Sequence, residues 1–98
     1  MAKKNGLRFD PAGTGLAAGL LFAVIHVMLV AVVASGHWQA FIDWWAEIHF
    51  ISVPATALPF DFAAAVTVIA AAFAIGAIAG WLFAAAWNYK MDFLRSLK

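Results

Sequence analysis

The sequence predicts an all-α membrane protein, with two transmembrane helices in a hairpin and a short amphipathic interfacial helix in the segment that connects them. Three observations predict this class. Hydrophobic residues make up 66% of the 98-residue chain and charged residues only 11%, against about 45–50% and about 25% in soluble domains. Two apolar stretches exceed the roughly 20 helical residues that cross a bilayer core of about 30 Å. All Lys and Arg residues lie near the two ends of the chain.

The composition also limits the domain count and the function. A chain of 98 residues forms one small domain, and we expect residues 1–98 to form a single membrane domain. A net charge of +1, without a basic patch interleaved with aromatic residues, argues against nucleic-acid binding. The chain has no cysteine, which excludes disulfides, thiolate chemistry and cysteine-ligated metals.

The first predicted span covers about residues 11–35. Asp10 is suited to be the N-cap, and Pro11 to the first helical position, where its missing N–H costs no hydrogen bond. Gly36 is suited to end the helix as a C-cap residue. The basic start and the small residues at 33–35 also fit a cleaved signal peptide loosely. The apolar stretch is longer than the usual 7–15 residues of such a peptide, however, so we expect a retained span.

The second predicted span covers about residues 62–88 and is followed by a short cytoplasmic tail, residues 89–98. No charged residue lies between Asp61 and Lys90. Asp61 is suited to cap the start of the helix. We expect the helix to continue for a turn or two beyond the bilayer.

Small residues recur every four positions in both spans. Residues four apart lie on one helix face, and a strip of small side chains lets another helix approach closely in lipid. The strips consist of Gly15, Gly19 and Ala23 in the first span, and of Ala72, Gly76, Gly80 and Ala84 in the second. Each strip is expected to face another helix. Whether the strips face each other or a partner subunit remains open at this stage.

The connecting segment, about residues 36–61, is external in this interpretation and rich in tryptophan. Aromatic and apolar residues recur within 38–50 with a helical period, which predicts a short amphipathic helix on the membrane surface. An ordered loop packed on a neighbour is the alternative. Aromatic rings with a polar atom favour the headgroup region. The expected interfacial anchors are Trp38, Trp44, Trp45, Trp87 and Tyr89.

The charge distribution predicts the orientation in the membrane. The basic residues are Lys3, Lys4 and Arg8 near one end and Lys90, Arg95 and Lys98 near the other. The connecting segment carries Asp43, Glu47 and Asp61 and no basic residue. The positive-inside bias then places both termini in the cytoplasm and the connecting segment outside. We expect an integral protein of a bacterial inner membrane.

His26 is the one ionisable residue within the two predicted spans. Such groups suggest function by default, and a neutral imidazole can ligate the metal of a haem or (bacterio)chlorophyll. The expected role is instead structural, with a neutral His26 hydrogen-bonded to a backbone or side-chain acceptor on a neighbouring helix. We expect no cofactor, with a tetrapyrrole at His26 as the alternative.

The stretch Phe9-Asp10-Pro11 ahead of an apolar run with a mid-membrane histidine is faintly similar to purple-bacterial light-harvesting polypeptides. Three features differ from that family. The spacing from Asp10 to His26 is shorter, Phe22 replaces a small residue four positions before the histidine, and those proteins have one span.

Sites for metal or enzymatic chemistry are not indicated. His37 and His49 lie in the connecting segment with two carboxylates, but neither HxxxH nor HExxH spacing occurs. Asp43 and Glu47 are four residues apart, which is typical of a solvated helix face. No nucleophile arrangement and no glycine-rich strand-to-helix loop is found. We therefore predict that the protein is neither an enzyme nor a metal-binding protein.

Residues 9–38 and 62–88 together resemble a family of small bacterial two-span membrane proteins of unknown function. The likeness rests on the Asp10-Pro11 start, the Gly/Ala-rich first span and a second span that ends in Gly76-Ala-Ile-Ala-Gly80-Trp-Leu-Phe-Ala84-Ala-Ala-Trp87-Asn88. The longer, Trp-rich connecting segment departs from that family. The resemblance implies an architecture and no activity.

The function predicted from the sequence is structural. We expect an accessory or assembly subunit of a larger membrane complex, or of a homo-oligomer, whose partners are the lipid bilayer and other subunits or copies of itself. The alternative is a haem- or (bacterio)chlorophyll-binding protein that uses His26 as axial ligand. A small transporter or channel is a third option, but polar groups that could line a path are scarce in the spans.

Overall fold

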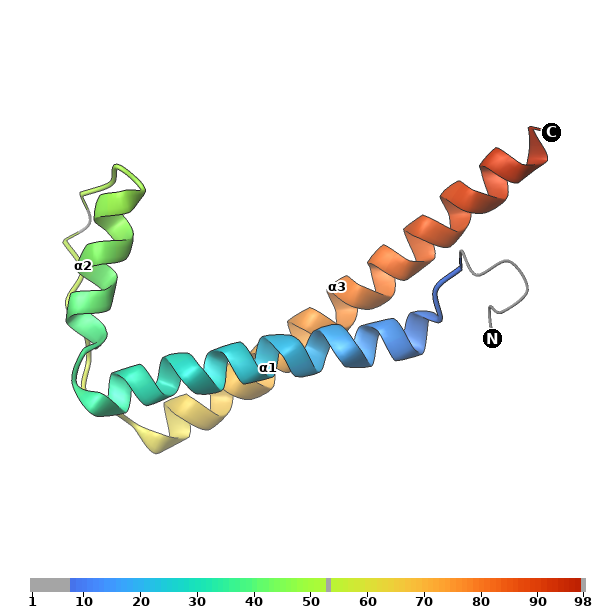
Figure 1. The fold of residues 1–98 in the computed structure, drawn as a ribbon. Helices are drawn as coiled ribbons and strands as arrows, with labels where there is room; N and C mark the ends of the chain where they lie inside the picture. The colour runs from blue at the N-terminus through green and yellow to red at the C-terminus, as the bar shows by residue number, and fades with distance from the viewer. Residues whose placement is uncertain (1–7, 53, 98) are drawn as a thin grey trace.

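The computed structural model describes residues 8–52 and 54–97. These residues form three α-helices and no strand: α1 (Pro11–Ser35), α2 (Trp38–Ile48) and α3 (Phe62–Ser96) (Figure 1). The predicted all-α class is confirmed for this part of the chain.

The ends of α1 have the local structure that the sequence predicts. Asp10 has an extended backbone, and its carboxylate accepts a hydrogen bond from the Gly13 N–H at 3.0 Å. Gly36 ends the helix with a φ of 88°, in the left-handed region that favours glycine. Its N–H donates to the Val33 carbonyl at 3.1 Å.

α3 begins in the same way and is longer than one span requires. The Asp61 carboxylate accepts a hydrogen bond from the Ala64 N–H at 3.1 Å. The helix has 35 residues and continues without a break through residues 89–96, as expected for a helix that leaves the bilayer. At about 1.5 Å per residue, these eight residues add about 12 Å beyond position 88.

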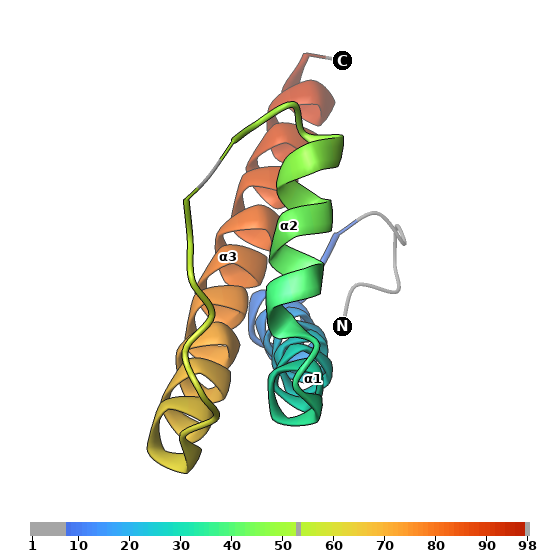
Figure 2. The same cartoon turned by 90° about the vertical axis from the view of Figure 1, so that its left-hand side faces the viewer.

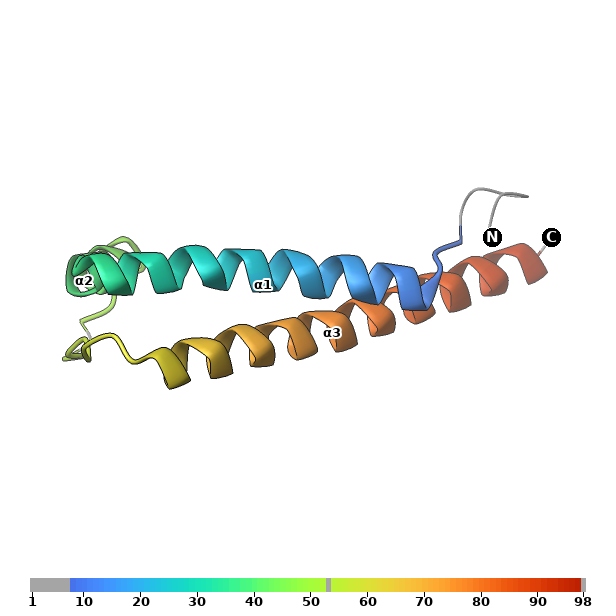
Figure 3. The same ribbon diagram turned by 90° about the horizontal axis from the view of Figure 1, so that it is seen from below.

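α1 and α3 run antiparallel and lie side by side. Figure 3 shows the two ribbons close together where α1 begins and separating toward α2. Both described ends of the chain lie at the closely packed end (Figure 1). This arrangement is compatible with the predicted hairpin.

α2 runs crosswise to α1, and Figure 3 views it nearly end-on. The segment that follows α2 returns beside it toward the start of α3 (Figure 2). If α1 crosses a bilayer, this geometry lays α2 along the bilayer surface.

α1 and α3 are both long and apolar enough to cross a membrane, by length and composition. Their apolar side chains mostly point outward rather than into a core. Met28 is 63% exposed, and Ile75 and Ile78 are each 61% exposed. Helices of this composition with so little burial are compatible with contact to the bilayer.

Candidate functional site

The small residues of α3 pack directly against α1. A Cβ atom built on Gly80 would lie 2.7 Å from the Ala18 Cβ and 2.8 Å from the Thr14 carbonyl oxygen. A Cβ on Gly76 would lie 2.8 Å from the Ala18 carbonyl oxygen. Real Cβ contacts are not that short, so the two backbones approach closely only because both positions are glycine.

The strip on α1 faces the strip on α3. A Cβ on Gly15 would lie 2.7 Å from the Ala77 carbonyl oxygen, and one on Gly19 would lie 2.9 Å from the Phe73 ring. The buried members of the two strips are Gly15, Gly19, Ala72, Gly76, Gly80 and Ala84, while Ala23 is half-buried. Both strips are therefore used inside the chain, and neither remains free for a partner subunit.

Asn88 extends the α3 strip by one more four-residue step and is buried, with 8% exposure. Its side-chain Oδ1 accepts a hydrogen bond from the Phe9 N–H at 2.8 Å. Its Nδ2 donates to the Phe9 carbonyl oxygen at 2.7 Å. The side-chain amide of Asn88 thus bonds to both the N–H and the carbonyl oxygen of Phe9, the residue just before the N-cap of α1.

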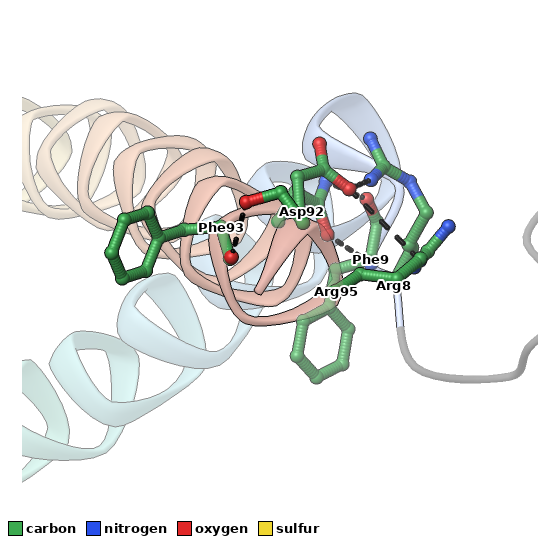
Figure 4. Close-up of polar contacts among 7 residues, drawn as sticks. Arg8, Phe9, Asp92, Phe93 and Arg95 are labelled. Atoms are coloured by element: carbon green, nitrogen blue, oxygen red, sulfur yellow. Dashed lines mark hydrogen bonds and ion pairs between the residues drawn. The ribbon is translucent and has the colours of Figure 1, made fainter. Parts of the chain in front are cut away.

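A charged pair follows the Asn88 contact at the next four-residue step along α3. Arg8 forms an ion pair and hydrogen bond with Asp92 (Figure 4). The Arg95 Nη2 lies 4.0 Å from the same Asp92 oxygen. The Arg8, Asp92 and Arg95 side chains are 37%, 53% and 56% exposed, so solvent screens the attraction and the pair adds little stability.

Three aromatic rings gather around the start of α1. The ring centroid of Phe9 lies 5.7 Å from that of Phe83 and 5.7 Å from that of Trp87. The Lys90 ammonium lies over the Trp87 ring, 4.1 Å from its centroid. Trp87 is half-buried and Tyr89 exposed. The expected anchor Trp87 therefore also takes part in helix packing.

His26 is half-buried on α1 and makes a local hydrogen bond. Its Nδ1 lies 2.9 Å from the Phe22 carbonyl oxygen, one turn earlier on the same helix. The sequence predicted an acceptor on a neighbouring helix. The acceptor instead lies on the same helix as His26. Because a carbonyl oxygen can only accept, this hydrogen bond places the proton on Nδ1. The other ring nitrogen, Nε2, makes no hydrogen bond within the described residues.

The side chain of Gln39 links α2 to the segment that follows it, through hydrogen bonds to Ala55 and Ala57. Its Nε2 donates to the Ala55 carbonyl oxygen at 3.0 Å, and its Oε1 accepts from the Ala57 N–H at 2.7 Å. The same Nε2 also donates to Asp43 at 3.0 Å. Gln39, which the helical period places beside Asp43 and Glu47, is half-buried and links two parts of the connecting segment.

The aromatic side chains of α2 differ in exposure. Trp38 stacks on Phe41 with ring centroids 5.3 Å apart. Trp44 and Trp45 are 54% and 44% exposed. Of the three tryptophans expected as anchors in this segment, Trp38 packs inward and the other two point outward.

Phe50 has an unusual backbone conformation just after α2. Its φ is 60°, and its side chain is 99% exposed. The Ile51 N–H donates to the Ala46 carbonyl oxygen at 2.9 Å, the long hydrogen bond of a Schellman helix end. Glycine usually occupies the left-handed position of that motif. A bulky residue there is strained, and strain of this kind is often associated with function.

The polar residues of the connecting segment are dispersed. The His49 Nδ1 bonds to the Trp45 carbonyl oxygen at 2.7 Å, and the His37 Nδ1 lies 3.0 Å from the Ser35 hydroxyl. No cluster of three or more potential metal ligands occurs among the described residues. Asp43 and Glu47 are exposed. Three basic residues used to predict the orientation lie outside the described residues: Lys3, Lys4 and Lys98.

Sequence reasoning missed the two amide contacts. Asn88 could have been found, because it continues the series of residues 72, 76, 80 and 84 by one step. Gln39 carries no such signal, since its partners lie 16 and 18 residues away in an irregular segment.

No protein-family model, no curated protein and no solved structure matches this chain. The resemblance to small two-span membrane proteins therefore stays a hypothesis.

Proposed function

We propose that this protein is a membrane-embedded accessory or assembly subunit that uses its connecting segment to dock on another subunit or another copy of itself. Both termini would lie in the cytoplasm and α2 on the outer surface. The observation that carries the proposal is Phe50, a fully exposed ring held in a strained conformation at the end of α2.

Other exposed apolar residues of α2 support the same interpretation. Trp44, Trp45 and Ile48 are each 44–54% exposed on α2, so several large apolar groups are presented together. Exposed apolar groups that gather in this way mark contact sites with protein or membrane. The bonds of Gln39 to the returning segment keep this surface ordered, which lowers the entropy cost of docking.

The small-residue strips provide no evidence for a partner subunit. From the sequence alone, the strips could face either each other or a partner subunit. They pack against each other within the chain, so a partner would have to contact the outer faces of the helices or the connecting segment.

The variant Phe50→Gly separates a docking role from a structural role. Glycine relieves the strain of a positive φ, so the isolated chain should become slightly more stable. Loss of the ring should nevertheless weaken association in mildly solubilised native membranes, measured as loss of co-purifying subunits or of mass. Phe93→Ala, an exposed ring at the other end of the molecule, is the matched control. Unchanged association of Phe50→Gly would contradict the docking role.

A second candidate function is tetrapyrrole binding through His26. The observation that favours it is the Nδ1 hydrogen bond to the Phe22 carbonyl, since histidines that ligate a metal commonly donate their other ring N–H to such an acceptor. Nε2 would then be the axial ligand. The test is the absorption spectrum of the protein isolated from native membranes. A Soret or Qy band that disappears in His26→Ala supports this candidate, and a colourless protein contradicts it.

A further inference from the structure

An apolar cleft of about 380 Å³ lies where α1 and α3 separate, beneath α2. It is open to the surroundings rather than enclosed. Its apolar walls come from three helices and include Val30, Val33, Trp38, Ile42, Ala65 and Val68. The returning segment, residues 56–61, completes the wall.

The cleft exists because the two ends of the helix pair pack differently. Glycines bring the backbones together near the start of α1, where a Cβ on Gly80 would lie only 2.7 Å from Ala18. Near the end of α1, the larger Val30 and Val33 face the widening gap (Figure 3). The described side chains leave this space unfilled.

The depth of the cleft indicates what could fill it. Asp61 and Val68 both line it, and seven helical residues correspond to a drop of about 10 Å. With Asp61 at the headgroup level, the lower part of the cleft lies within the hydrocarbon region of a bilayer. Water is disfavoured in such apolar space, whereas a lipid acyl chain matches it.

The negatively charged residues of the connecting segment indicate which kind of lipid headgroup the cleft would favour. Residues 36–61 carry three carboxylates and no Lys or Arg, so a net negative headgroup is repelled. The Oδ2 atom of Asp61 accepts from the Ala64 N–H, while its Oδ1 has no partner within the described residues. An ammonium group is the complementary ligand for that free oxygen.

We propose that this cleft binds one acyl chain of an outer-leaflet phospholipid whose headgroup carries an ammonium group, as in phosphatidylethanolamine. The site rests on the membrane embedding in the proposed function. It does not depend on the docking role of α2.

Photo-crosslinking tests the proposal with the full chain in vesicles of phosphatidylethanolamine and phosphatidylglycerol. A trace of either lipid carries a diazirine in its acyl chain, and labelled peptides are mapped by mass spectrometry. Label from the phosphatidylethanolamine probe should be several-fold enriched at residues 30–33 and 64–68 over other exposed positions of α1 and α3. The phosphatidylglycerol probe should give no such enrichment.

Two variants and a control sharpen this test. Ala65→Trp places bulk in the cleft and should abolish the enrichment, whereas Ala74→Trp, on an exposed part of α3, should not. Asp61→Asn keeps a capping acceptor and should retain the acyl-chain label while losing the preference for phosphatidylethanolamine.

Each outcome bears on a different claim. Even labelling along both helices, unaffected by Ala65→Trp, would overturn the cleft proposal and leave the membrane embedding intact. Enrichment at the cleft without a headgroup preference would overturn the role of Asp61. Absence of label from both helices would contradict membrane embedding itself.

Discussion

The side-chain amide of Asn88 forms two hydrogen bonds with the main chain of Phe9, accepting from its N–H and donating to its carbonyl oxygen. Phe9 precedes α1, so neither group has a partner in that helix. Asn88 lies four residues after Ala84, which is fully buried. The strip of small residues on α3 therefore ends in a polar contact that fixes where α1 begins.

Asn88→Ala should destabilise the α1–α3 pair. Both main-chain groups of Phe9 would lose their partner, and a neutral hydrogen bond contributes about 0.5–1.5 kcal/mol. Hydrogen bonds between membrane helices contribute about 0.6–2 kcal/mol, so we expect a loss of about 1–2 kcal/mol in reversible unfolding in mixed micelles. Thr67→Ala is the control, since its hydroxyl donates only to Ala63 in the same helix. Equal effects of the two variants would contradict the role of Asn88.

Gly80→Leu should destabilise the protein more than Phe83→Leu. A Cβ at position 80 already collides with Ala18, and overpacking costs about 1–3 kcal/mol. Phe83 is 54% exposed. It loses its ring contacts with Phe9 and Trp87, of a kind worth about 0.5–1.5 kcal/mol, but leucine keeps an apolar side chain there and introduces no clash. The same unfolding assay compares them. A smaller effect for Gly80→Leu would show that the two backbones do not approach as described.

Gln39→Ala should loosen the connecting segment without disturbing the α1–α3 interface. The Ala57 N–H would lose the Gln39 Oε1 acceptor at 2.7 Å, so we expect faster hydrogen exchange at residues 55–57 and unchanged exchange in α3. Glu47→Ala is the control, because the Glu47 side chain makes no hydrogen bond within the described residues. Unaltered protection of residues 55–57 in Gln39→Ala would contradict the contact.

Arg8→Ala should have a small effect that depends on salt. The Arg8 and Asp92 side chains are 37% and 53% exposed, and exposed ion pairs contribute about 0–1 kcal/mol. Unfolding measured at low and at high ionic strength should show a difference from the unmodified chain only at low salt. A large loss that persists at high salt would contradict the description of Arg8–Asp92 as an exposed ion pair whose attraction is screened by salt.

Local signals in the sequence predicted the helices well. Asp10, Gly36 and Asp61 carry capping chemistry that acts within three residues, and each caps a helix as expected. The four-residue repeat of small side chains also identified the faces that pack. It could not identify the partner, because a Gly/Ala strip accepts any helix that comes close.

Contacts between distant residues could not be predicted in the same way. Asn88 meets Phe9 across 79 positions, and that pairing depends on the register in which the two helices pack. The strained conformation of Phe50 is likewise invisible in the sequence, since phenylalanine carries no preference for a positive φ. His26 was expected to form a hydrogen bond with a neighbouring helix, but its Nδ1 bonds to a carbonyl oxygen of its own helix.

We propose that the chain crosses the membrane twice, with α2 outside and the Arg8–Asp92 end in the cytoplasm. Labelling of introduced thiols in intact cells tests this orientation, because the chain contains no cysteine. Ala40→Cys on α2 should react with a membrane-impermeant maleimide in intact cells, and Ser96→Cys at the end of α3 only after permeabilisation. Labelling of Ser96→Cys in intact cells, with Ala40→Cys protected, would overturn this orientation.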